Sequence, residues 1–256
     1  MRIKLIKNRN YPELKKLYEE FDVGDDGEIC VAVGGDGTFV KAAKSFPGPI
    51  LPIRSDDPGS VGYYADISIK DIDFAIDHLK KKKYTIEKLS NKIALSHSGK
   101  RYYAVNEVLL SNMRGEISFK VFEREGGKKR QIYPYVMSGD GIIITSMIGS
   151  TAYNKSAGGP ILLSSKVVCI TFLNVDGPYK NPIVADSSRE FEIIVEKYNG
   201  TLRYDGINVA VLRPGESFKV GLSEKELKVI RFDSKREEFS AKLERIINSK
   251  MIKEIK

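Results

Sequence analysis

A glycine-rich turn between a strand pattern and a helix pattern is the feature of this sequence that most limits its fold. The apolar, β-prone run 29–33 leads into the turn Gly34–Thr38, and residues 39–46 follow with helical periodicity. Glycine lets backbone N–H groups approach a ligand closely, and a helix N-terminus favours anions. The turn is neither a Walker A loop nor a dinucleotide fingerprint, because no Gly-Lys-Ser/Thr follows and the glycine spacing differs. The pattern predicts a phosphate site at a strand-to-helix turn.

Asp36 lies inside this turn, where its carboxylate would repel a phosphate group. Two functions reconcile the carboxylate with the phosphate site. Asp36 either holds a cation that bridges phosphates, or accepts a proton from a hydroxyl that is about to be phosphorylated. A third interpretation is structural, with Asp36 as a cap of the following helix. The turn by itself leaves all three open.

Strand and helix patterns alternate through the N-terminal third of the chain. Strands are predicted at 2–6, 28–33 and 50–53, and helices begin at Pro12, after the glycine turn and at about Asp71. This alternation predicts an α/β domain with a parallel sheet and helices on its faces. Segment 54–62, rich in Ser, Asp, Pro and Gly, follows the third strand, at the sheet edge where such domains bind ligands.

After Tyr84 the sequence changes to short runs of aromatic and β-branched residues separated by glycine- and serine-containing turns. This spacing predicts an antiparallel β-sandwich. We therefore expect an α/β domain at 1–84, a β-rich sandwich domain at 85–234, and a C-terminal helix at 235–256 that packs back on the first domain. The predicted sandwich strands are 91–96, 101–111, 118–123, 131–136, 141–145, 167–173, 190–195, 202–204, 207–212, 218–221 and 228–231.

Composition narrows the classes of partner. The chain has 256 residues and a net charge of +8, which suits a polyanionic ligand such as a nucleotide or polyphosphate. The charges are spread along the chain without a basic-aromatic repeat, which disfavours nucleic acid. Cys30 and Cys169 lie in apolar runs as expected for buried thiols, and with only His78 and His97 a zinc site is disfavoured. We expect a cytoplasmic protein with no membrane partner, because no signal peptide or long apolar run is present.

Two further stretches place polar groups where they need partners. Asn106-Glu107 interrupts the apolar run 102–110. An amide can pair with a base edge and a carboxylate can accept both hydroxyls of a ribose, although a polar pair at a strand end is the alternative. Segment 149–160 gathers glycines and small hydroxyl residues around Tyr153. Small side chains leave room for a flat ligand, and the ring offers a stacking face.

Together these motifs resemble the signature set of the NAD kinase family. The set consists of Gly34–Thr38, Asn106-Glu107 and the block 149–160, and the similarity continues through Asp205-Gly206 to about residue 232, most of the chain. The first motif also occurs in diacylglycerol and sphingosine kinases and, loosely, in phosphofructokinases, whereas the Gly-Ser-Thr-Ala-Tyr start of the block is specific. The resemblance implies transfer of a phosphoryl group from ATP, or from polyphosphate, to the 2′-hydroxyl of the adenosine ribose of NAD, giving NADP. It also implies a divalent metal, Mg²⁺.

The resemblance carries over to individual positions. Asp36 is implied as the catalytic group, acting as the base or orienting acceptor for the 2′-hydroxyl. The glycine turn would line the phosphates, Asn106-Glu107 would hold adenosine and ribose groups, the block around Tyr153 would contact adenine, and Asp140 would lie at the nicotinamide end. The implied binding residues are Gly35, Gly37, Thr38, Asn106, Glu107, Asp140, Thr151, Ala152, Tyr153 and Ser156.

The sequence departs from the family pattern at two positions. Asp57 stands where an Asn is usual, which adds negative charge near the phosphates, and Ile207 stands after Asp205-Gly206 where Gln or His is commoner. The first departure leaves the donor and the use of metal open, and the second removes a polar contact to the ligand.

Two alternative functions share part of this pattern, and the sequence also predicts an oligomer. A lipid kinase would share the glycine turn but gives no reason for the block 149–160, and a non-catalytic NAD-binding protein would not need Asp36. We also expect a homodimer or homotetramer, because a sandwich with many strands leaves edges and faces that need covering.

Overall fold

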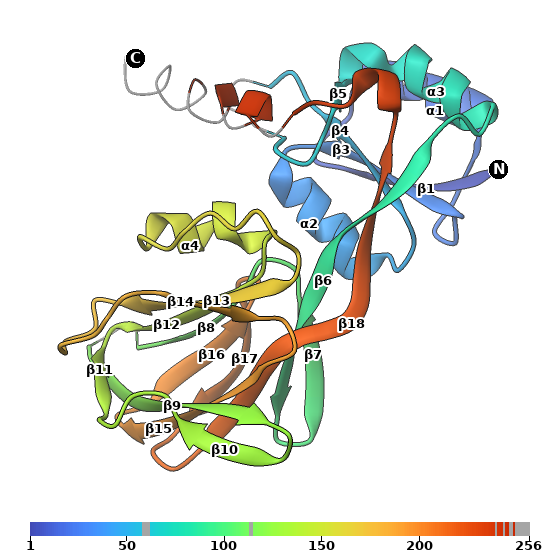
Figure 1. Ribbon diagram of the computed structural model, residues 1–256. Helices are drawn as coiled ribbons and strands as arrows, with labels where there is room; N and C mark the ends of the chain where they lie inside the picture. The colour runs from blue at the N-terminus through green and yellow to red at the C-terminus, as the bar shows by residue number, and fades with distance from the viewer. Residues whose placement is uncertain (58–61, 113–114, 239, 243, 246–247, 249–256) are drawn as a thin grey trace. The chain divides into compact units, whose positions relative to one another are not determined.

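The computed structural model describes residues 1–57, 62–112, 115–238, 240–242, 244–245 and 248. The chain divides into two compact units (Figure 1). Unit 1 contains 1–89 and 227–256, and unit 2 contains 90–226. The boundary between the units falls between Leu89 and Ser90, inside a strand that runs from one unit into the other. The boundary predicted from the change in residue pattern lies at Tyr84.

Unit 1 is the predicted α/β fold. Its parallel strands run in the order β4-β3-β1-β2, with Val31 opposite Leu5 on one side and Leu51 on the other. Helices α1 and α3 lie on one face of the sheet and α2 lies on the other (Figure 1). The strands are β1 (Arg2–Lys7), β2 (Asp22–Val23), β3 (Ile29–Gly34), β4 (Ile50–Arg54) and β5 (Ile67–Ser68). The helices are α1 (Lys15–Glu20), α2 (Asp36–Ser45) and α3 (Ile72–Lys80), with short 3-10 turns at Pro12–Leu14, Ile69–Asp71 and Asp233–Lys235.

Apolar periodicity explains this layering. β3 is buried along its whole length, as expected for a strand covered on both faces. On one face Val31 and Val33 share a core cluster with Leu17 of α1 and Ala75 of α3. Burying a side chain of this size stabilises the fold by roughly 1.5–3 kcal/mol, so the cluster fixes the sheet whose carboxyl edge carries the glycine turn.

Unit 2 is the predicted antiparallel sandwich. One sheet has the order β14-β13-β12-β8-β16-β17, and the other contains β10-β9-β15-β18 with β11 beside β9 and β7 beside β6. Phe119, Phe191 and Phe218 are fully buried in the core of this unit. The strands are β6 (Thr85–His97), β7 (Lys100–Ala104), β8 (Glu107–Ser111), β9 (Ile117–Glu125), β10 (Lys128–Gln131), β11 (Met137–Gly139), β12 (Gly141–Thr145), β13 (Val167–Leu173), β14 (Ile183–Asp186), β15 (Glu190–Lys197), β16 (Gly200–Tyr204), β17 (Ile207–Leu212) and β18 (Ser217–Arg231). A 3-10 turn (Gly149–Thr151) and helix α4 (Tyr153–Ser156) follow β12.

Several strand predictions were wrong in detail. The predicted strand 101–111 is two strands, because the backbone at Val105 and Asn106 bonds a side chain instead of a neighbouring strand. The predicted strand 131–136 ends at Gln131, since Pro134 has no N–H to donate and the Gln131 amide bonds the local backbone. The two runs at 218–221 and 228–231 form one long strand, β18.

The C-terminal segment belongs to unit 1 and contacts its N-terminal part. The apolar residues that predicted its helical period, Phe239, Leu243, Ile246 and Ile247, lie outside the described residues. Among those described, Lys242 pairs with Asp66 at 2.6 Å and Arg245 donates to the Gly62 carbonyl at 2.9 Å. Within the described ranges, no helix has the length and apolarity that crossing a bilayer requires.

Candidate active site

The glycine turn lies where β3 ends and α2 begins. Gly34 has φ +150°, and a Cβ there would lie 2.3 Å from the Thr38 hydroxyl oxygen, so the position requires glycine. Gly35 is the N-cap residue of α2, and Gly37 in its first turn is exposed. The N-terminal N–H groups of a helix attract anions. The turn therefore offers a backbone surface suited to phosphate, and phosphate binding there stays a prediction.

Asp36 is oriented by a loop rather than by its own helix. It is the first residue of α2, whose N-cap residue is Gly35, so Asp36 does not occupy the N-cap position itself. Its Oδ1 instead accepts the backbone N–H of Tyr63 at 2.7 Å. Burial raises the pKa of Asp36, while the backbone N–H groups of Tyr63 and Tyr64 and the charge of Arg245 oppose the rise. A carboxylate with a raised pKa is a better proton acceptor than an ordinary surface Asp.

The residues around the turn fit a loosely held Mg²⁺ ion rather than a metal cage. The described residues contain no group of three or more His, Cys, Asp or Glu side chains placed to hold a metal ion. Magnesium in phosphoryl-transfer sites is usually held by one or two carboxylates, the phosphates of the substrate and water. The Asp36 carboxylate, at the start of a turn suited to phosphate, matches that donor set.

Asp57, the first departure from the family pattern, is neutralised by its neighbours. The Tyr11 hydroxyl donates to Asp57 at 2.7 Å, Asn8 donates at 3.5 Å, and the Arg9 guanidinium forms an ion pair with it. These contacts, led by the Tyr11 hydrogen bond, lower the pKa of Asp57. The added negative charge therefore comes together with a cation from the end of β1.

The predicted residues of unit 2 begin at a sharp corner between β7 and β8. The Asp205 carboxylate accepts the backbone N–H groups of Val105, Asn106 and Glu107 at 2.9, 2.7 and 3.3 Å. Asp205 itself lies in the two-residue turn between β16 and β17, with φ +44°, next to Gly206 with φ +78°. A carboxylate in this turn thus fixes the chain where it crosses from one sheet to the other.

The block 149–160 meets this corner at the Asn106 carbonyl. The Thr145 hydroxyl donates to that oxygen at 2.8 Å. A Cβ on Gly149 would lie 1.8 Å from the same oxygen, so only glycine permits the approach. The structure therefore brings Asn106 together with the start of the block.

Buried polar side chains hold the block in shape. The Asn154 amide donates to the Pro160 carbonyl at 2.9 Å and accepts the Thr171 hydroxyl at 2.6 Å. Ser150 donates to Met147 O at 2.7 Å and accepts from Leu162 N at 3.1 Å. Sequence reasoning missed Ser150 and Asn154 as supports, and the only signal for them was polarity inside a segment of small residues.

The remaining predicted residues differ in their surroundings. The Tyr153 side chain is 44% exposed, so its ring is open to a ligand, and the Thr151 hydroxyl donates to Ile148 O at 3.4 Å. Ala152 links Thr151 to α4, which ends at Ser156. Asp140 precedes β12 and accepts from the Asn174 amide at 2.6 Å.

Asp140 is not brought to the Asn106 corner within this chain. Thr145 at the far end of β12 is the residue that pairs with Glu107, whereas Gly141 pairs with Ser111. Five residue steps along a strand span about 17 Å. The structure therefore separates Asp140 from Asn106. The predicted residues are also divided between the units: unit 1 contains Gly35, Asp36, Gly37 and Thr38, and unit 2 contains the others.

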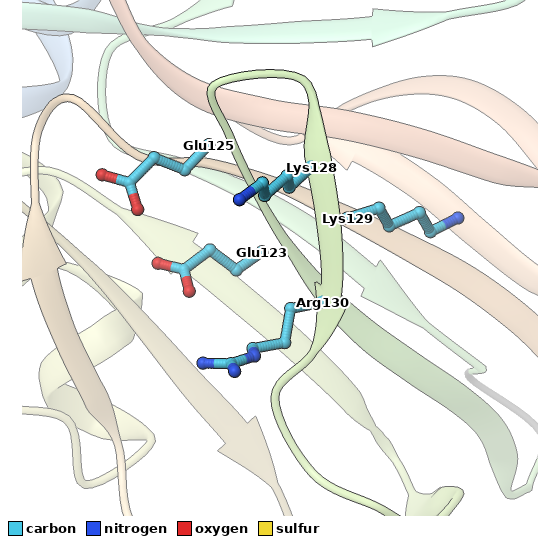
Figure 2. Close-up of a pocket in the computed structure, with 5 residues that line it drawn as sticks. All are labelled: Glu123, Glu125, Lys128, Lys129 and Arg130. Atoms are coloured by element: carbon cyan, nitrogen blue, oxygen red, sulfur yellow. The ribbon is translucent and has the colours of Figure 1, made fainter.

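A hollow of about 540 Å³ lies at the β9–β10 hairpin, and none of the residues that line it is a predicted site residue (Figure 2). Arg130 stands opposite Glu123 and Lys128 opposite Glu125, while Lys129 points to the other face and pairs with Glu192. Opposite charges across an edge hairpin stabilise its register and keep the edge from pairing with another chain. The hollow is explained by the hairpin and is not part of the candidate site.

Comparisons with known proteins agree on one family. The model of the ATP-NAD kinase N-terminal domain matches residues 4–84, and that of the ATP-NAD kinase C-terminal domain matches residues 118–232. The chain is 31% identical to the NAD kinase of Clostridium kluyveri over 242 residues, covering 90% of this chain and 84% of that protein. It is 28% identical to the NAD kinase of Sulfurimonas denitrificans over 220 residues, covering 84% and 74%.

Two solved structures share the fold. The NAD kinase from Archaeoglobus fulgidus in complex with ATP has a TM-score of 0.74 at 20% identity, covering 97% of this chain and 99% of that one. Yeast NADH kinase complexed with NADH has a TM-score of 0.78 at 16% identity, covering 96% and 86%.

Proposed function

This chain belongs to the ATP-NAD kinase family and is an NAD kinase, and we propose that it uses Asp36 to take the proton of the adenosine 2′-hydroxyl while ATP donates the phosphoryl group. The family assignment rests on the two domain matches and on 31% identity across most of the chain. The observation that carries the catalytic role is the Asp36 carboxylate, held by Tyr63 N at 2.7 Å, with burial raising its pKa, at the start of a phosphate-binding turn.

Unit 1 supplies the groups for phosphoryl transfer. The backbone at Gly35, Gly37 and Thr38 would bind the donor phosphates. The 2′-oxygen attacks the terminal phosphorus, the bond from that phosphorus to the bridging oxygen of ADP breaks, and the hydroxyl proton passes to Asp36. Asp36 is also the residue that would hold Mg²⁺, which supplies charge neutralisation on the phosphates when bound.

Unit 2 supplies the groups for the dinucleotide. Asn106 would bind the adenine edge and Glu107 the ribose hydroxyls, because these are the partners that an amide and a carboxylate suit. Tyr153 would stack on adenine, with Thr151, Ala152 and Ser156 beside it, and Asp140 would contact the nicotinamide end. The fixed corner at Asn106 and the exposed Tyr153 ring support these roles.

The phosphoryl donor is either ATP or polyphosphate. The name of the family and the ATP complex of the Archaeoglobus fulgidus enzyme support ATP, and polyphosphate is the alternative. We propose ATP with Mg²⁺. The test is to incubate the chain with NAD, Mg²⁺ and either donor, and to read NADP with an NADP-dependent dehydrogenase. NADP formed with polyphosphate and not with ATP would reverse the choice of donor, and no NADP with either would refute the function.

We also propose a homodimer or homotetramer. Strands β14 and β17 lie at the two ends of their sheet, and Val184 and Val211 on them are 49% and 59% exposed. Exposed apolar edge strands favour association. Light scattering at micromolar concentration should give at least twice the mass of the chain. A fully active monomer would contradict the proposal.

We propose the cytoplasm as the compartment, with no membrane or nucleic acid partner. Cys30 and Cys169 are buried free thiols, and burial raises the pKa of Cys30 to about 12, which keeps it unreactive. Free thiols are usual in a reducing compartment. Fractionation of cells with an antibody to the chain tests this, and recovery with the membranes would oppose it.

A further inference from the structure

The loop that orients Asp36 is held by cations that come from much later in the chain. The loop 62–66 contributes Tyr63, whose N–H donates to Asp36 at 2.7 Å. The loop is closed by a turn in which Ala65 N donates to Gly62 O at 3.0 Å. This turn presents N–H groups to Asp36 and leaves its carbonyl groups to be bound from elsewhere.

Arg245 binds those carbonyl groups. Its Nη2 donates to Gly62 O at 2.9 Å and to Ala65 O at 3.2 Å, so one guanidinium spans both ends of the turn. Glu237 pairs with the same guanidinium and fixes its direction. The planar, always charged guanidinium suits a task that needs several donors in a fixed geometry.

A second set of contacts anchors the far end of the loop. Arg231 of β18 donates to Tyr64 O at 2.8 Å and to Asp66 at 2.9 Å, and the side chains of Arg231 and Asp66 are each only 5% exposed. Lys242 binds Asp66 from the C-terminal segment at 2.6 Å. Removing one partner of a buried ion pair is costly because it leaves the other charge buried and unpaired, so this end of the loop is fixed.

We propose that Arg245 is a positioning residue for phosphoryl transfer, acting on Asp36 through the turn Gly62–Ala65. Arg245 touches neither substrate, and its role is to keep the Tyr63 N–H aimed at the Asp36 carboxylate. Its charge also acts directly on Asp36 by lowering the pKa of that carboxyl. The inference rests on the proposed catalytic role of Asp36. It assigns to the C-terminal segment a task in catalysis that goes beyond packing on unit 1.

The test compares three variants of the full chain. Arg245→Met removes the charge and the donors at similar length, and Arg245→Lys restores the charge with a smaller set of donors. Arg236→Met is the matched control. Arg236 lies nearby in the sequence and pairs with Glu87 Oε1 at 3.1 Å, whereas Arg231 binds the other oxygen of Glu87, Oε2, at 2.8 Å and keeps that partner in the variant. Thermal unfolding establishes that each variant folds.

We expect Arg245→Met to lower kcat by roughly 10- to 100-fold, the loss typical of a catalytic group displaced by about 1 Å. KM for NAD should stay within about twofold, because Asp36 acts in the transition state. Arg245→Lys should restore part of kcat, and Arg236→Met should match the wild type. Wild-type kcat in Arg245→Met, or an equal loss in Arg236→Met, would overturn the inference. If Arg245→Met does not fold, Arg245→Lys decides: a partial loss of kcat at unchanged KM supports the inference and wild-type kcat overturns it.

A readout independent of activity separates this inference from the proposed function. Hydrogen exchange of the peptide spanning 62–66 should be faster in Arg245→Met or Arg245→Lys than in the wild type and unchanged in Arg236→Met. A wild-type chain that makes no NADP would refute the proposed function, whereas unchanged exchange in the Arg245 variants would refute the positioning role.

Discussion

The corner at Asn106 gives a sharp prediction through Asp205, a residue that has no contact with ligand in the proposed function. Asp205→Asn replaces one carboxylate oxygen by an NH₂ group and removes the charge. Either the bond to Val105 N at 2.9 Å or the pair to Asn106 N at 2.7 Å and Glu107 N at 3.3 Å must then be lost. The substitution therefore loosens the backbone that carries Asn106 and Glu107.

The size of the expected rise in KM for NAD follows from the lost hydrogen bonds. A bond to a charged group contributes about 1.5–3 kcal/mol, and Asp205 is partly exposed, so we take the lower end. A cost of about 1.5 kcal/mol lowers the equilibrium constant for the native position of the corner roughly tenfold. Because only the native position binds NAD, KM for NAD should rise, by at most about tenfold. KM for ATP should not change, since the proposed donor site is the glycine turn of unit 1.

The assay measures both KM values for Asp205→Asn and for a matched control, Asp186→Asn. Asp186 also accepts a backbone N–H, from Ser188 at 2.9 Å, but lies at the end of β14. The control should leave both KM values at wild type. An unchanged KM for NAD in Asp205→Asn, or equal increases for NAD and ATP, would refute the reasoning.

Three further substitutions test other parts of the account. Tyr153→Ala should raise KM for NAD by roughly 5- to 150-fold, since base stacking contributes about 1–3 kcal/mol, with little change in KM for ATP; an equal change in both would contradict an adenine site. Asp57→Asn removes the carboxylate that pairs with Arg9, so KM for ATP should fall a few-fold at low ionic strength. At high salt KM for ATP should return to the wild-type value, because salt screens the charge. A change in KM that does not depend on salt would contradict an electrostatic cause. Burial opposes ionisation of Glu192, but hydrogen bonds from Arg124 and other partners outweigh it and lower its pKa. Its stabilisation is therefore present above about pH 4.5 and is lost as pH falls through the folded pKa. Glu192→Gln should cost about 1–3 kcal/mol of unfolding free energy at pH 7, with the difference from wild type shrinking below about pH 4 in denaturant titrations; a constant difference would contradict the linkage.

The sequence patterns predicted the features that neighbouring residues determine and missed those that depend on contacts between residues far apart in the chain. The turn Gly34–Thr38 was predictable, because apolar periodicity and glycine chemistry act within a few residues. The corner at Asn106 was predicted as continuous strand, since its cause is Asp205, 99 positions later, and no periodicity reports such a contact. The bond from Arg245 to Gly62 spans 183 positions and was equally invisible. The helix α4 at Tyr153 was missed because it is only four residues long.

Asp57 shows how a departure in sequence can be reinterpreted from structure. From the sequence alone, Asp57 is expected to add a negative charge beside the phosphates. The structure pairs it with Arg9 and with the Tyr11 hydroxyl, residues at the end of a different strand. Parallel strands bring their carboxyl ends to one edge of a sheet, so residues far apart in sequence compensate one another there.

The most direct test of the central claim is the turnover of Asp36→Asn. The Asn side chain keeps the size and can still accept the Tyr63 N–H, but it cannot take a proton from the 2′-hydroxyl. General-base catalysis contributes roughly 10²–10⁴ in rate, so kcat should fall by about that factor while calorimetry shows NAD binding unchanged. An Asp36→Asn variant that turns over NAD at close to the wild-type rate would show that Asp36 is not the proton acceptor.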